Sequence, residues 1–175
     1  VEYYREYYQD TGIFECSVYP GFEKSLKALK AAGKRLFVAT SKPEVYARRI
    51  IEHFDLDQYF EYVAGMELDG GRGSKAEVIG YLINTCRMQD KKRILMIGDR
   101  EHDVLGAKQE GLDCMGVLYG FGNREELEKA GEEKGAVNYT ENMQAIVFAT
   151  TAVLYNKPYE DFEKVLDDLR AKSFD

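Results

Sequence analysis

The sequence predicts an α/β fold, with a three-layer α/β/α core built around a mostly parallel sheet. Short apolar runs rich in β-forming residues recur along the chain from Tyr19 onward. Amphipathic segments with apolar residues at three- and four-residue spacing lie between these runs. Strands that alternate with helices indicate βαβ units, whose strands are parallel and whose crossovers are right-handed.

The apolar runs predict strands at residues 35–39, 62–64, 93–97 and 114–118. The amphipathic segments end near Gly, Asp or Asn, and they predict helices at residues 21–32, 44–54, 75–86 and 101–110. Two more helices are expected near the C-terminus, at residues 141–154 and 159–171. The tyrosine-rich opening, residues 1–12, reads as one further helix with an apolar stripe.

Length and composition indicate one domain that works in a reducing compartment. The chain has 175 residues, of which 45% are hydrophobic, enough for a single core. Its net charge of −7 and dispersed Lys and Arg argue against nucleic-acid polymers and anionic membranes as partners. Cys16, Cys86 and Cys114 suggest neither a disulfide framework nor a zinc site. We therefore expect a cytoplasmic protein, and its oligomeric state stays open.

The strongest functional pattern is "RILMIGDREHD", residues 93–103. Gly98 permits a tight turn after the strand, Asp99 stands at the strand's carboxyl end, and Asp103 follows one helical turn later. Carboxylates spaced in this way can bind Mg²⁺, which prefers oxygen ligands and leaves positions for water and phosphate. Alternatively, Asp99 caps the next helix and Asp103 complements its dipole.

A second pattern is "LFVATSKP", residues 36–43, where a strand runs into small hydroxyl residues before a helix. The Thr40 hydroxyl and the Ser41 backbone N–H could both donate to a phosphate at a helix N-terminus. The alternative is an ordinary Ser/Thr N-cap. Lys42 is expected to be a solvated side chain.

The third pattern, "GGRGSKAEV", places Lys75 at the start of a helix after a glycine-rich turn. A cation there opposes the helix dipole, which suggests that an anion lies nearby. Arg72 is the rival cation, and either could be a surface residue. All three patterns fall where a strand's carboxyl end meets a loop or helix, the edge along which open α/β sheets bind ligands.

The chain resembles the haloacid dehalogenase-like hydrolases, in particular their phosphoglycolate phosphatase-like branch and its bacterial 5'-nucleotidase-like subgroup. The resemblance is carried by "VYPGFEKSLKALKAAGKRLFVATSKP", "FEYVAGMELDGGRGSKAEVI", "MIGDREHDVLGAKQEG" and "GVLYGFGNREEL". It implies a Rossmann-like core at residues 19–150. Residues 1–18 would be the tail of a helical cap, and residues 151–175 a C-terminal helical extension.

The resemblance also implies a role for each motif residue. Thr40 and the Ser41 amide would hold a phosphoryl oxygen, and Lys75 would neutralise the phosphate and the nucleophile. Asp99 and Asp103 would hold Mg²⁺. The implied activity is that of a phosphoric monoester hydrolase acting on small phosphorylated metabolites through an aspartyl-phosphate. For Arg100 and His102 we predict no role.

The family's nucleophile comes from a DxD motif that follows a hydrophobic strand, and here only "HFDLDQYF" looks similar. Helical periodicity precedes Asp55 and Asp57, the pair follows Thr40 instead of preceding it, and Gly-Thr does not come next. We therefore interpret this stretch as a helix end and a turn.

It follows that the chain lacks the nucleophile, the family's first strand and most of the cap. That strand would lie between those ending at Thr40 and Asp99, so we expect two unpaired strand edges in a fragment that is inactive by itself. One rival is a non-catalytic phosphate- or metabolite-binding module on the same scaffold. A receiver-type phosphoacceptor domain is disfavoured, because its acidic pair precedes its hydroxyl residue.

Overall fold

The sheet at the centre of the molecule has five strands, all paired in parallel, in the order β3-β2-β6-β4-β5. In this computed structural model, residues 8–131, 145–149 and 154–155 are described. The strands are β2 (Arg35–Pro43), β3 (Tyr62–Met66), β4 (Ile94–Gly98), β5 (Asp113–Gly116) and β6 (Ala145–Phe148). The predicted parallel sheet is confirmed, and four of its strands lie where the apolar runs placed them.

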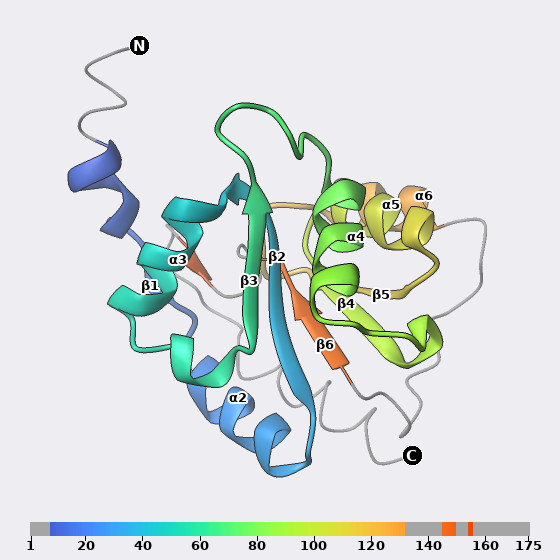
Figure 1. The fold of residues 1–175 in the computed structure, drawn as a ribbon, viewed down its shortest axis with the longest axis horizontal. Helices are drawn as coiled ribbons and strands as arrows, with labels where there is room; N and C mark the ends of the chain where they lie inside the picture. Colours follow the sequence, from blue (N-terminus) through green and yellow to red (C-terminus); the bar gives the residue numbers. More distant parts are fainter. Residues whose placement is uncertain (1–7, 132–144, 150–153, 156–175) are drawn as a thin grey trace.

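Helices cover both faces of the sheet. They are α2 (Phe22–Ala31), α3 (Glu44–His53), α4 (Lys75–Thr85), α5 (Glu101–Glu110) and α6 (Arg124–Gly131). Figure 1 shows α2 and α3 on one side of the sheet and α4, α5 and α6 on the other. This is the three-layer α/β/α arrangement that the alternating pattern predicted.

Burial explains why the inner strands have continuous apolar sequences. All five residues of β4 are buried, and residues 36–40 of β2 are buried as well. A parallel strand covered by helices on both faces has no solvent side, so its sequence does not alternate between apolar and polar residues. The core therefore lies along the sheet and beneath the helices on both faces.

Strand β6 corrects two of our expectations. The helix predicted over residues 141–154 is wrong at residues 145–148, which form the middle strand. The expected pair of unpaired edges is also wrong, because β6 lies between β2 and β4 and pairs with both. The run Ala-Ile-Val-Phe is short, β-branched and wholly apolar, and such a run fits a buried strand as well as a helix. Pairing with the edges of β2 and β4 is what makes this run a strand and not a helix.

A second, small sheet joins β1 (Ser17–Val18) to β7 (Leu154–Tyr155) in antiparallel pairing. The helical extension predicted over residues 151–175 is therefore wrong at residues 154–155. The helix predicted at 159–171 lies outside the described residues, as does most of the tyrosine-rich opening, of which residues 8–10 are helical. The division of the chain into a cap tail, a core and an extension stays a prediction.

The stretch "HFDLDQYF" is a helix end and a turn, as predicted. Helix α3 ends at His53, Asp55 has a positive φ of 54°, and residues 57–59 form a short 3₁₀ helix. Asp55 and Asp57 are exposed and precede the first residue of β3, so they lie at the amino edge of the sheet. They cannot act at the opposite edge.

The three cysteines are free. Burial raises the pKa of Cys16 and Cys86. Burial, with a smaller contribution from the negative charge of Asp103, raises the pKa of Cys114 to about 12. Thiols held in the neutral form are poor nucleophiles. In the described part of the chain, no helix is both long and apolar enough to cross a bilayer.

Candidate active site

Thr40 lies at the carboxyl edge of the sheet, within β2. Its side chain is buried, and its hydroxyl oxygen accepts a hydrogen bond from the Lys42 backbone N–H at 3.0 Å. The N-cap interpretation is wrong here, because α3 begins at Glu44 with Pro43 in the cap position. Ser41 follows Thr40 and is exposed. The local turn therefore holds the Thr40 hydroxyl at the sheet edge.

Lys75 is the first residue of α4, as predicted. Ser74 caps this helix and forms a reciprocal capping box with Glu77, which fixes where the helix begins. Only 7% of Lys75 is exposed. Its ammonium donates a hydrogen bond to the Ala39 carbonyl oxygen at 3.0 Å and lies 2.9 Å from Asp103 Oδ1. A buried cation is thus placed one residue from Thr40 along β2.

Asp103 is buried on α5, and protein groups contact both of its carboxylate oxygens. Oδ1 pairs with Lys75, while Oδ2 accepts hydrogen bonds from the Asp99 and Arg100 backbone N–H groups at 3.1 and 3.2 Å. Gly98 makes this geometry possible, since a Cβ there would lie 2.2 Å from the Asp103 Cβ. Asp103 therefore ties Lys75 to the turn after β4.

Asp99 is fully buried at the carboxyl end of β4. Its Oδ2 accepts a hydrogen bond from the Phe121 backbone N–H at 2.7 Å. Cβ atoms at Gly120 and Gly122 would lie 2.2 Å from Asp99 Oδ2 and 1.9 Å from the Asp99 backbone oxygen. Our sequence reasoning missed this loop as part of the site. The paired glycines of "YGFG" were the available signal, because they allow close backbone approach.

Arg100 and His102, for which no role was predicted, point to different surroundings. The Arg100 Nε lies 2.7 Å from Glu126 of α6, and the Glu101 N–H donates to the same carboxylate oxygen at 2.9 Å. These bonds, that from Arg100 first, lower the pKa of Glu126. The His102 side chain is 58% exposed. Arg100 thus joins the start of α5 to α6, and His102 faces solvent.

Two other cations lie apart from the Lys75 pair. Arg72 pairs with Glu44 and Glu67, so of the two candidate cations it is Lys75 that contacts Asp103. Lys42 was expected to be solvated, but it is half-buried and donates a hydrogen bond to the Tyr8 hydroxyl.

The middle of the site is formed by the residue after β6. Ala149 is 1% exposed, and its backbone N–H donates to the Ile97 carbonyl oxygen at 2.8 Å. Because β6 lies between β2 and β4, Ala149 follows the strand between those that carry Thr40 and Asp99. The described part of this central strand therefore brings no carboxylate to the edge.

The donor set fits Mg²⁺ with one protein carboxylate. Asp99 is a buried carboxylate at the sheet edge, and Mg²⁺ is commonly held by one or two carboxylates together with waters and phosphate oxygens. Both oxygens of Asp103 are already bonded to Lys75 and backbone amides. No cluster of three or more His, Cys, Asp and Glu side chains suited to a metal occurs among the described residues.

Known proteins show the same sequence pattern and the same fold. The haloacid dehalogenase-like hydrolase family matches residues 1–117. A 5'-nucleotidase of Pseudomonas aeruginosa is 46% identical over 127 residues, which are 73% of this chain and 57% of that protein. The tyrosine-protein kinase PtkA of Mycobacterium tuberculosis is 42% identical over 126 residues, covering 72% of this chain and 43% of PtkA.

A solved structure agrees with these matches. The crystal structure of a predicted phosphatase from Clostridium acetobutylicum has a TM-score of 0.70 and 39% identity, covering 95% of this chain and 68% of that one. The chain therefore belongs to the haloacid dehalogenase-like hydrolase family. It spans 57% and 43% of the lengths of the two curated relatives named above.

Proposed function

We propose that this chain carries most of the active site of a Mg²⁺-dependent phosphomonoester hydrolase for small phosphorylated metabolites, similar to a 5'-nucleotidase or a phosphoglycolate phosphatase. The observation that carries the proposal is the buried Lys75 ammonium at the carboxyl edge of the sheet. An ammonium has three N–H donors, and in the described part of the structure two acceptors, on Ala39 and Asp103, use them. The third is available for a phosphoryl oxygen.

Each neighbouring group has a distinct part in the proposed reaction. Thr40 donates its hydroxyl to a second phosphoryl oxygen, and the Ser41 amide supports it. Lys75 neutralises charge on the phosphoryl group, and such a fixed cation stabilises the transition state because it needs no reorganisation. Asp103 holds Lys75 in position, a narrower part than the metal ligation that we predicted from the sequence.

Asp99 would hold the metal ion. When bound, Mg²⁺ supplies charge neutralisation between the phosphate oxygens and the attacking group. The Phe121 N–H and the close packing of Gly120 fix the direction of the Asp99 carboxylate. Among the described residues, the central strand brings no carboxylate to this edge, so we expect the 175-residue polypeptide to bind phosphate without hydrolysing esters.

Calorimetric titration of the chain with inorganic phosphate, with and without Mg²⁺, tests this proposal. Binding should require Mg²⁺ and weaken about ten- to a hundredfold in Asp99→Asn, since even a hydrogen bond to a charged group is worth about 1.5–3 kcal/mol. The exposed Asp113 on β5 gives the matched control Asp113→Asn, which should bind normally. Equal binding by both variants would overturn the assignment of Asp99.

A second assay asks whether a nucleophile is present. No Mg²⁺-dependent release of phosphate from p-nitrophenyl phosphate or nucleoside monophosphates is expected. Turnover that Asp99→Asn abolishes would show that the nucleophile lies within the chain. The rival function, a non-catalytic phosphate-binding module, is favoured by Ala149 at the end of the central strand. Hydrolysis by a longer polypeptide with an added carboxylate strand would exclude this rival.

The proposed setting follows from composition and family. The substrates are small phosphate esters of the cytoplasm, and neither nucleic-acid polymers nor membranes are expected as partners. A net charge of −7 is consistent with this, because polyanion-binding proteins concentrate positive charge on a surface.

A further inference from the structure

Arg72 is a second, separate centre of charge in the loop between β3 and α4, three residues before Lys75. Its side chain is 15% exposed, and its guanidinium pairs with Glu44 at 3.0 Å and with Glu67. Its Nε donates to the Gly65 carbonyl oxygen at 3.1 Å, and its Cζ lies 3.9 Å from the centre of the Tyr81 ring. One side chain thus joins the end of β3, the loop and two helices.

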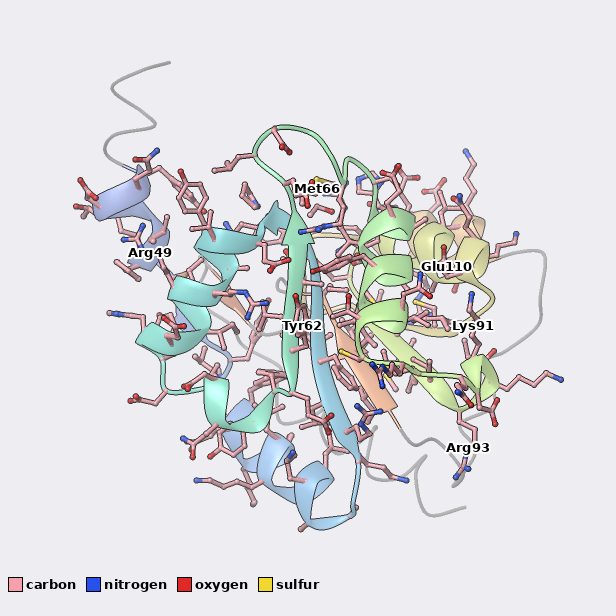
Figure 2. The ribbon with its side chains drawn as sticks, viewed as in Figure 1. Arg49, Tyr62, Met66, Lys91, Arg93 and Glu110 are labelled. Atoms are coloured by element: carbon pink, nitrogen blue, oxygen red, sulfur yellow. The ribbon has the colours of Figure 1, made fainter. Side chains whose placement is uncertain are left out.

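Glu44 connects this network to the other half of the site. It is the first residue of α3, four residues after Thr40, and its Oε2 accepts hydrogen bonds from Arg72 and from the Gly65 N–H. A Cβ at Gly65 would lie 2.6 Å from the Lys42 carbonyl oxygen and from the Glu44 backbone nitrogen. The turn after Thr40 is therefore pressed against the carboxyl end of β3, which Met66 marks in Figure 2.

Local hydrogen bonds hold parts of the loop that carries Arg72: the Gly70 N–H donates to the Glu67 carbonyl oxygen, the Gly71 N–H to Asp69 and the Gly73 N–H to Glu77. Arg72 joins this loop to α3 through Glu44. The loop contains Gly70, Gly71 and Gly73, and Gly70 has a φ of 85°. Glycine loses more conformational entropy on folding than any other residue, so this loop depends on its anchors. A planar guanidinium can bond two carboxylates and stack on a ring at once, which a lysine cannot do.

We propose that Arg72 is a positioning residue for phosphate binding. Through Glu44 it fixes the distance between the Thr40 turn and Lys75, so that hydroxyl and ammonium reach one phosphoryl group together. Lys75 connects the start of α4 to β2 through its hydrogen bond to the Ala39 carbonyl oxygen. Arg72, in the loop before α4, pairs with Glu44, which follows β2. The two contacts therefore join the same two parts of the chain. The inference rests on the proposed phosphate site.

The test compares Arg72→Met with Arg48→Met by calorimetric titration with inorganic phosphate in the presence of Mg²⁺. Arg48 is the matched control because it also lies 3.0 Å from Glu44, on its other carboxylate oxygen, while its Cζ lies 4.7 Å from the centre of the Tyr62 ring in β3 and not over Tyr81 of α4. Coupled sites change affinity by about 5- to 150-fold. We expect Arg72→Met to weaken binding about tenfold and Arg48→Met to change it less than about twofold.

A double-variant cycle separates positioning from general stability. In a Thr40→Val background, one of the two phosphate contacts is already gone, so the spacing no longer matters and the Arg72→Met effect should shrink below about twofold. If Arg72→Met does not fold, Arg72→Lys and Arg48→Lys give the same comparison with charge retained. Equal affinities in the matched pair, or a full Arg72 effect in the Thr40→Val background, would overturn the inference. No phosphate binding by the unmodified chain would instead overturn the proposed function.

Discussion

The strands that flank the candidate site and the strand between them contribute very differently to it. β2 and β4 bring Thr40 and Asp99, and α4 adds the buried Lys75. β6 brings apolar side chains and then Ala149. The flanking elements therefore carry the groups that would bind phosphate and metal, while the middle strand contributes buried apolar side chains to the core. We therefore expect that the described part of this sheet edge can bind phosphate and Mg²⁺ without supplying the attacking group.

The largest expected effect comes from a charge placed in the middle strand. Val147 is fully buried in β6, and Val147→Asp would bury a carboxylate without a partner. The cost is several kcal/mol, a large part of the total stability of a domain. Chemical denaturation should show loss of cooperative unfolding. Val45→Asp, at a position 47% exposed, is the control and should unfold normally.

On the flanks, Lys75→Met would leave Asp103 buried without its cation. Breaking a buried pair in this way costs about 3–5 kcal/mol. Lys91 pairs with Glu110 at 3.0 Å on the surface (Figure 2), where its side chain is 45% exposed. Lys91→Met should therefore cost less than about 1 kcal/mol in the free energy of unfolding. Similar losses for the two variants would show that the Lys75 pair is well solvated.

Ala149→Asp tests whether the middle strand ends at the centre of the site. The added carboxylate should lower the melting temperature without Mg²⁺ and bind the ion together with Asp99. A ligand at 100 times its dissociation constant stabilises a fold by about 2.7 kcal/mol. Mg²⁺ should therefore raise the melting temperature of this variant more than that of Ala149→Asn. An equal response would mean that residue 149 faces away from Asp99.

The smallest expected effect concerns the connection between α5 and α6. The Arg100 and Glu101 bonds lower the pKa of Glu126 in the folded state. A lowered carboxyl pKa contributes stability above the unfolded value, and this is lost as pH falls through the folded value. The melting temperature should therefore fall less steeply below pH ~4.5 in Glu126→Gln than in the unmodified chain. If the melting temperature falls equally steeply with pH in both proteins, Glu126 does not contribute to the loss of stability at low pH.

The positions of the candidate site residues that flank the middle strand were predictable from sequence, and the middle strand β6 was not. Gly98, Asp99 and Lys75 stand at local patterns, a strand end and a helix start, that need no knowledge of distant residues. The environment of Lys75 depends on Asp103 and Ala39, which the fold brings together, so the contacts came only from the structure.

Residues 145–148 show the limit of local reasoning. Their apolar run has no turn signal that marks it as a strand, and its partners, β2 and β4, begin at Arg35 and Ile94. The pairing energy that makes it a strand comes from those distant edges, whereas helical periodicity was judged from neighbours alone. The contact of Arg72 with Glu44 was missed for the same reason, since 28 residues separate them.

The position of β6 also has a consequence for synthesis. The sheet's middle strand is the last of its five in the sequence, and Ala145 pairs with Arg35 and Ile94. Contacts between residues far apart in sequence form slowly, because the chain must first lose the entropy of the intervening loop. A nascent chain cannot join the two halves of this sheet until Phe148 has left the ribosome. Until then the β2 and β4 edges stay exposed, as candidates for chaperone binding.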